Sequence, residues 1–162
     1  HMPEESLISI ILIIQLVAII GASFTAKLSS KFGNVKVLAA IVGIWSLICA
    51  GVYFVNNAQQ FYVAAVLVGI VMGGVQSLSR STYSKYIPPN IPDTASYFSF
   101  YDVTEKLSIV VGLFTFGFVE AITHEMRNSA LVLDGFFIIG LLLLLSLAVA
   151  EAGIKSAKAA IA

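Results

Sequence analysis

Five long apolar stretches constrain this chain more than any other feature. Crossing a bilayer core of about 30 Å takes roughly 20 helical residues, because each residue of an α-helix rises about 1.5 Å. Five stretches reach that length, at residues 7–28, 35–55, 61–86, 96–121 and 129–150. Only 11% of the residues are charged, whereas about a quarter are charged in a typical soluble domain. The sequence therefore predicts an all-α fold, a polytopic membrane helix bundle with five transmembrane helices.

Short segments flank this apolar block. His1 and Met2 are typical of a cloning remnant, so we interpret residues 1–6 as a tag remnant and outer N-terminal segment. Residues 7–150 form the five-helix transmembrane fragment, and residues 151–162 form a cytoplasmic tail. The second and fifth spans contain almost no polar side chains, which predicts that they face lipid around most of their circumference.

The basic residues predict the orientation of the chain in the membrane. Seven fall on one side of the expected topology: Lys27, Lys31, Lys36, Arg80, Lys85, Lys155 and Lys158. The loops on the opposite side contain only Arg127. Because Lys and Arg accumulate in cytoplasmic loops, we expect the C-terminus in the cytoplasm and the N-terminus outside.

Four charged residues lie inside the third and fourth spans, where an unpaired charge is costly. Arg80 lies about six residues, or roughly 9 Å, inside the third span, and Asp102 lies at a similar depth in the fourth. Asp102 and Lys106 share one helical face at i,i+4 spacing, and Glu105 is one residue from that line. We expect a network of these four charges. It acts either as a gate or coupling site whose ion pairs break and re-form, or as a static lock between two helices near the cytoplasmic interface.

Three polar residues lie deeper in the expected bundle. Lys106 is roughly 15 Å from the start of its span, so we expect it in a substrate or coupling site that also includes Asp102 and Glu105. Gln15 and Gln76 lie near mid-depth, and a buried amide requires hydrogen-bond partners. Each amide is either a contact between helices or a contact with a ligand, and we include both among the candidate site residues.

Two further patterns bear on packing. Gly69 and Gly73 are four residues apart in the third span, a spacing that lets a neighbouring backbone approach closely. An aromatic group, Tyr97, Phe98, Phe100 and Tyr101, lies at the expected cytoplasmic interface. It is typical of an aromatic belt, and a stacking pocket is the alternative.

Several function classes are excluded or disfavoured. A formal net charge of zero removes the basic surface that nucleic-acid binding requires, so we expect no nucleic-acid partner. Cys49 is the single cysteine, which excludes an intrachain disulfide framework and a thiolate metal cluster. The sequence contains no H-E-x-x-H, G-x-S-x-G or P-loop motif. We therefore expect no enzyme activity, no catalytic residues, no metal and no cofactor.

Residues 26–36 read A-K-L-S-S-K-F-G-N-V-K and join the first two expected spans. This segment resembles the loop form G-x-x-x-D-R-x-G-R-x-K that major facilitator superfamily transporters carry between helices two and three and between helices eight and nine. Three residues keep this cytoplasmic loop pattern: Lys31, Gly33 and Lys36. Ala26, Ser30 and Asn34 depart from it. The acid that Ser30 replaces is expected to help lock one conformation, so this half is expected not to carry that latch.

Later segments follow in an order that extends the resemblance over nearly the whole chain. They are residues 73–81 (G-G-V-Q-S-L-S-R-S), residues 86–88 (Y-I-P), residues 99–103 (S-F-Y-D-V) and Lys106. This order resembles the C-terminal portion of the bacterial "unknown major facilitator" family, which is related to the autophagy-linked vacuolar amino-acid effluxers of fungi.

The resemblance implies that the five spans are helices eight to twelve of a twelve-helix transporter, a partial C-terminal half of that fold. Helices eight, ten and eleven would border the central cavity, with nine and twelve outside. Gln15, Gln76, Asp102 and Lys106 all lie on the three lining spans. The resemblance also implies a bacterial inner (plasma) membrane.

The expected function is that of a fragment of a secondary active transporter, which moves a small polar solute by alternating access. Amino acids are the first candidate substrates. The expected partners are the lipid bilayer, the missing N-terminal helices of the parent transporter and, because the cavity face lacks its other half, a second copy of the chain in a homo-oligomer. The alternative is a non-transporting helical membrane interaction or scaffold protein, whose charges only specify assembly.

Overall fold

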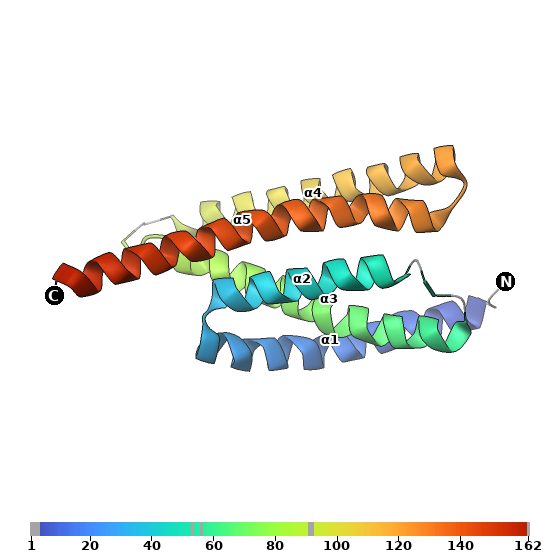
Figure 1. Cartoon of the computed structure of the whole chain (residues 1–162), viewed down its shortest axis with the longest axis horizontal. Helices are drawn as coiled ribbons and strands as arrows, with labels where there is room; N and C mark the ends of the chain where they lie inside the picture. Colours follow the sequence, from blue (N-terminus) through green and yellow to red (C-terminus); the bar gives the residue numbers. More distant parts are fainter. Residues whose placement is uncertain (1–3, 53, 56, 91–92, 162) are drawn as a thin grey trace.

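The computed structural model describes residues 4–52, 54–55, 57–90 and 93–161, with side chains described for 10–51, 54–55, 57, 59–90 and 93–154. The described chain forms five helices: α1 (Glu4–Phe32), α2 (Asn34–Val52), α3 (Ala58–Tyr86), α4 (Thr94–Thr123) and α5 (Met126–Ile161). Each helix is long and apolar enough to cross a membrane. They run back and forth along one long axis (Figure 1). The expectation of an all-α membrane bundle of five spans is confirmed.

Most of the helices extend a few residues beyond the expected spans. The largest difference is at α5, which continues to Ile161 through the segment expected to be a tail. The extension contains several Ala and Lys residues, which have high helix propensity. The expected remnant at His1 and Met2 lies outside the described residues.

Two tight turns join neighbouring helices. Gly33 separates α1 from α2 with φ of +92°, a left-handed conformation that glycine adopts without a steric cost. Its N–H donates to the carbonyl oxygen of Ser29 at 2.9 Å. His124 ends α4 in the left-handed region, and its N–H donates to the carbonyl oxygen of Glu120 at 2.8 Å. Both contacts bond a carbonyl group that the helix end leaves free.

Helices α1 and α3 form the closest helix pair. A Cβ atom on Gly69 would lie 2.9 Å from the carbonyl oxygen of Ile14, and one on Gly73 would overlap that of Ala18. Gly21 of α1 approaches the backbone of Ile70 in the same way. The close approach expected at Gly69 and Gly73 is therefore present, and its partner is α1.

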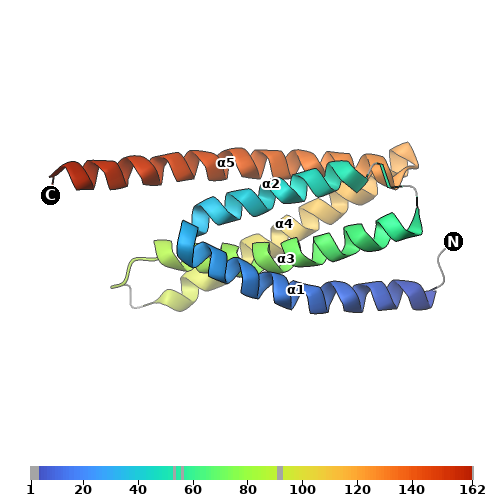
Figure 2. The same cartoon turned by 60° about the horizontal axis from the view of Figure 1, so that its bottom comes forward.

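Helix α2 lies at the centre of the bundle, between α3 and α5 (Figures 1 and 2). Its buried side chains are Asn34, Val35, Val37, Leu38, Ala39, Ile41 and Val42. The expectation that the second span faces lipid around most of its circumference was wrong. An apolar side chain is equally compatible with lipid and with a neighbouring helix, so hydropathy does not distinguish them. The expectation is correct for α5, whose most apolar window contains no buried residue.

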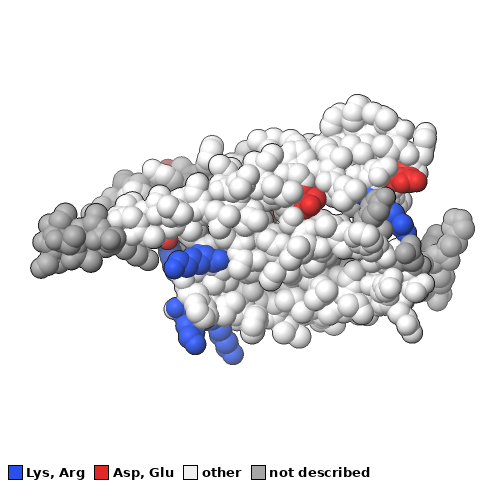
Figure 3. Space-filling model, in the orientation of Figure 1, with Lys and Arg blue, Asp and Glu red and all other residues white. Residues whose placement is uncertain are grey.

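Helices α4 and α5 form a hairpin beside the other three helices (Figure 1). Helix α4 is described throughout, and none of its residues is buried. At one end of the bundle, where α1 ends and α2 begins, Lys and Arg side chains gather (Figure 3). The fold therefore presents a nearly uncovered, charge-bearing helix to its surroundings.

Candidate functional site

An ion pair joins α3 to α4. Arg80 Nη1 lies 3.1 Å from Asp102 Oδ1, and the side chains are 53% and 47% exposed. The two residues meet because α3 and α4 are antiparallel and each residue lies a short way inside its helix from the same end. The pair expected between Arg80 and Asp102 is therefore formed.

Two aromatic rings lie beside the guanidinium group of Arg80. Its Cζ atom lies 5.5 Å from the ring centre of Phe98 and 5.9 Å from that of Tyr101. Tyr101 Oη donates to Ser79 Oγ at 3.0 Å, which fixes this ring against α3. Such cation–π contacts stabilise a cation independently of its carboxylate partner. Phe98 and Tyr101 thus contact a charge, which the interpretation as an aromatic belt did not include.

Sequence reasoning missed Tyr83. Its ring centre lies 5.0 Å from that of Tyr101 and 6.2 Å from that of Phe98, and its hydroxyl donates to the carbonyl oxygen of Tyr97 at 3.0 Å. Tyr83 is three residues after Arg80 on α3, and residues at that spacing share a helix face. That spacing was the available signal.

The four expected charges do not form one network among the described residues. Lys106 Nζ lies 3.6 Å from Glu105 Oε1, with the Lys106 side chain 72% exposed. Asp102 pairs with Arg80 instead of with Lys106. The expected network therefore resolves into two separate pairs, because α3 places a second cation near Asp102.

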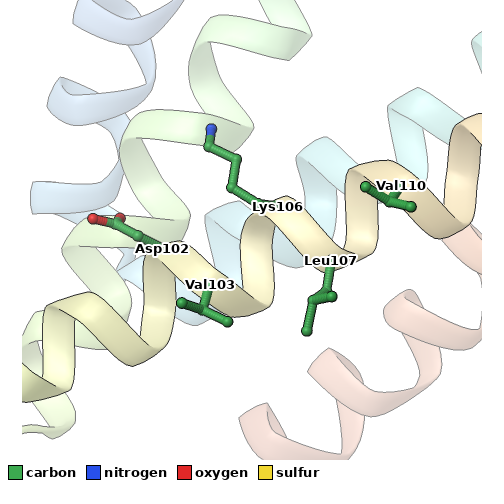
Figure 4. A pocket seen from close by; sticks show the side chains of 5 residues that line it. All are labelled: Asp102, Val103, Lys106, Leu107 and Val110. Carbon is green, nitrogen blue, oxygen red and sulfur yellow. The ribbon is translucent and has the colours of Figure 1, made fainter.

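A shallow hollow of about 330 Å³ runs along α4. It is lined by Asp102, Val103, Lys106, Leu107 and Val110. Figure 4 shows the Asp102 carboxylate reaching toward α3, with Val103 and Leu107 on the opposite side of the α4 ribbon from Lys106. The surface of the hollow is apolar, so Asp102 and Lys106 line it with their aliphatic parts and not with their charged groups.

The two glutamines expected in the site lie away from this hollow. Gln15 on α1 and Gln76 on α3 are both exposed, and neither makes a hydrogen bond to another described residue. Their amides therefore do not connect helices within the described part of the chain. The structure does not bring them together with Lys106.

The loop motif lies at the turn between α1 and α2, next to the end of α3. Lys31 lies 5.5 Å from the ring centre of its neighbour Phe32, Gly33 forms the turn, and Lys36 is exposed. The buried Asn34 accepts from Lys85 Nζ at 2.8 Å and donates to Ser81 Oγ at 3.3 Å. This contact between the turn and the end of α3 was not expected from the sequence.

A second contact missed by sequence reasoning joins α2 to α5. Ser46 Oγ donates to Asp134 Oδ1 at 2.5 Å. These are among the few polar residues of the second and fifth spans, and that rarity was the available signal. The contact holds the central helix to the outer hairpin.

No group of three His, Cys, Asp or Glu residues that would hold a metal ion occurs among the described residues. The cationic and acidic groups of the site are those of α3 and α4: Arg80, Asp102, Glu105 and Lys106. Chemically, the arrangement is suited to binding and releasing charged groups.

Comparisons with known proteins match nearly the whole chain. The family model described as "Vacuole effluxer Atg22 like" matches residues 1–158. The "Uncharacterized MFS-type transporter YxiO" of Bacillus subtilis is 27% identical over 141 residues, 87% of this chain and 32% of that protein. "Autophagy-related protein 22" of Yarrowia lipolytica is 34% identical over 158 residues, 88% of this chain and 26% of that protein.

The protein of the same name in Saccharomyces cerevisiae is 28% identical over 162 residues, 92% of this chain and 29% of that protein. The chain thus spans less than a third of each of these relatives. No solved structure matches the chain significantly.

Proposed function

Because the chain belongs to the vacuole effluxer Atg22-like family, we propose that it is part of a secondary active transporter that moves a small polar solute by alternating access. Amino acids are the first substrates to test. Membership of a transporter family disfavours an enzyme, and the membrane-spanning helices agree with transport.

The single observation that supports this proposal is the exposure of α4. Asp102, Glu105 and Lys106 lie in a span-length helix that buries none of its described residues. Charged groups in a transmembrane helix are costly in lipid and normally face protein or a water-filled cavity. A cavity completed by further helices would supply that environment.

The remaining helices of the transporter are the proposed partner of this face. Substrate sites of such transporters lie between two repeats that rock against each other. Lys106 and Asp102 would contribute to that site from this half, with Glu105, Gln15 and Gln76 as further candidates. The Arg80–Asp102 pair would close the end of the site that we assign to the cytoplasm.

Transport by proteoliposomes tests the proposal. The protein to use is this chain joined to its remaining helices, with counterflow of radiolabelled amino acids as the measurement. We expect Lys106→Ala to abolish transport, because the deep cation of the site is lost. Lys27→Ala, the matched change on α1, should leave transport unchanged.

Three outcomes would contradict parts of the proposal. Transport that is unchanged in Lys106→Ala removes this residue from the site. Flux of other solutes but of no amino acid removes the proposed substrate class. The absence of any flux in the reconstituted protein favours the alternative, a helical scaffold whose charges only specify assembly.

Orientation and location are also proposals. We place the C-terminus in the cytoplasm, from the basic residues at the end of the bundle where α1 ends and α2 begins. The similarity to the Bacillus subtilis protein supports a proposed location in the bacterial inner (plasma) membrane. A cysteine at Asn57, in a Cys49→Ala background, should then react with an impermeant reagent applied to the outside of cells. Reaction only after permeabilisation would reverse this orientation.

We also propose that the chain by itself forms a homo-oligomer through the uncovered side of α4. Native mass measured in mild detergent should exceed that of one chain. A monodisperse monomer would contradict the proposal.

A further inference from the structure

Asp102 belongs to two features of the molecule at once. Its Oδ1 atom pairs with Arg80 at 3.1 Å, and the same side chain lines the hollow along α4 with Lys106. A ligand that binds the Asp102 carboxylate therefore acts directly on a contact that joins α3 to α4.

The carboxylate of Asp102 remains accessible to a second cation. Its side chain is 47% exposed, and within the described residues it has no partner other than Arg80. One carboxylate accepts several hydrogen bonds, and those from charged donors are the strongest. A protonated amine can therefore reach the exposed part of Asp102 before Arg80 leaves.

Arg80 retains other contacts if it loses Asp102. The rings of Phe98 and Tyr101 lie within 6 Å of its guanidinium group, and a cation over an aromatic face is stabilised by the ring. Tyr101 is held by its bond to Ser79 on the same helix as Arg80. Loss of the ion pair therefore does not leave the guanidinium without stabilisation.

A cation near Asp102 would suit a small solute that carries both charges. Lys106 lies one turn after Asp102, its side chain is 72% exposed, and Glu105 lies at the longer distance of 3.6 Å from its ammonium group. An amine at Asp102 and an anionic group at Lys106 would each meet a group of opposite charge. Val103 and Leu107 point away from Lys106 on the other side of the helix (Figure 4).

We propose that Asp102 binds the protonated amine of the transported solute, and that this amine competes with Arg80 and so loosens the contact between α3 and α4. The inference rests on the proposed function. It assigns Asp102 both to recognition and to opening, because a single carboxylate serves the ligand and the ion pair.

Distance measurements between α3 and α4 test this proposal. The chain would carry Cys49→Ala, spin labels at positions 84 and 99, and a lipid nanodisc around it. Three probes of similar size separate the charges: isopentylamine has only the amine, 4-methylpentanoate has only the carboxylate, and L-leucine has both. We expect isopentylamine and L-leucine to lengthen the distance and 4-methylpentanoate to leave it unchanged.

Variants identify the residue responsible. Asp102→Asn should start at the longer distance and should show no further lengthening with isopentylamine, because the ion pair that the amine displaces is already absent. Asp102→Glu keeps the carboxylate and should keep the response, which shows that a loss in Asp102→Asn is not simple misfolding. Glu120→Gln removes a carboxylate of α4 outside the hollow and should respond as the unsubstituted chain does.

The proposal is overturned if 4-methylpentanoate produces the same change as the amine, if no probe changes the distance, or if Asp102→Asn responds normally. Transport assays separate this outcome from a failure of the proposed function. Amino-acid transport with an unchanged apparent affinity in Asp102→Asn would overturn only the inference. An intact response to isopentylamine in a protein that transports nothing would overturn only the function.

Discussion

A Cβ atom on Gly73 of α3 would overlap the backbone carbonyl oxygen of Ala18 in α1. The obstacle is main chain, so it cannot rotate away as a side chain would. Small residues at such positions let transmembrane helices approach closely, and packing then replaces the hydrophobic effect as the source of stability. The α1–α3 pair therefore depends on the absence of a side chain at this position.

Gly73→Ala should destabilise the bundle. Overpacking in a tightly packed interior typically costs about 1–3 kcal/mol, and here two helix backbones must move apart. Unfolding in detergent, followed by circular dichroism, measures the change. Gly112→Ala is the control, because a Cβ atom there meets nothing within 4 Å. Equal stability of the two variants would contradict the proposed role of Gly73.

Ser46→Ala should weaken the link between α2 and α5. The substitution removes the hydroxyl that donates to Asp134 and leaves that carboxylate without a donor among the described residues. An unsatisfied group of this kind costs about 1–3 kcal/mol. Ser146→Ala on α5 is the matched control. The hydroxyl of Ser146 donates to the carbonyl oxygen of Leu143 in its own helix. A loss in the control as large as that in Ser46→Ala would count against the link.

Lys85→Met should loosen the turn between α1 and α2. Methionine keeps most of the length of the side chain but cannot donate to Asn34, which then loses its 2.8 Å contact. Hydrogen–deuterium exchange of the amides in residues 29–36 should become faster. Lys36→Met removes an exposed cation on the same turn and should leave this exchange unchanged. Identical protection in the two variants would show that the Asn34 contact does not hold the turn.

Asp93 gives a test based on pH. The hydroxyl and the backbone N–H of Ser96 donate to its carboxylate and hold the pKa of that carboxyl below its usual value. Because the pKa is lower in the folded state, this contribution to stability is present above the unfolded value of about 3.9 and is lost as the pH falls through the folded value.

The titration of Asp93, measured by carboxyl carbon NMR, should therefore have a midpoint below about 3.9. Asp93→Asn keeps an oxygen that caps the start of α4 and should remove the pH dependence of amide protection at Ser96. A normal midpoint for Asp93 would show that Ser96 does not stabilise the carboxylate.

The sequence by itself determined the membrane-spanning helices and one contact of the site. Bilayer thickness sets the length of a span, so the five helices follow from runs of apolar residues. The basic residues of the turn between α1 and α2 lie at the same end of the bundle as those at the end of α3. In a chain of antiparallel helices, every second connection lies at the same end. Arg80 and Asp102 could be paired for the same reason, since each lies a few residues from a shared end.

Only the tertiary structure decided how the helices pack around one another. The sequence predicted a close approach at Gly69 and Gly73 but not that α1 supplies it, and it did not predict the central position of α2. In a membrane, an apolar side chain is about as stable against lipid as against protein. Hydropathy therefore does not indicate which face of a helix is buried. The contacts of Ser46 with Asp134 and of Lys85 with Asn34 join residues far apart in the chain, and their geometry exists only once the helices are packed.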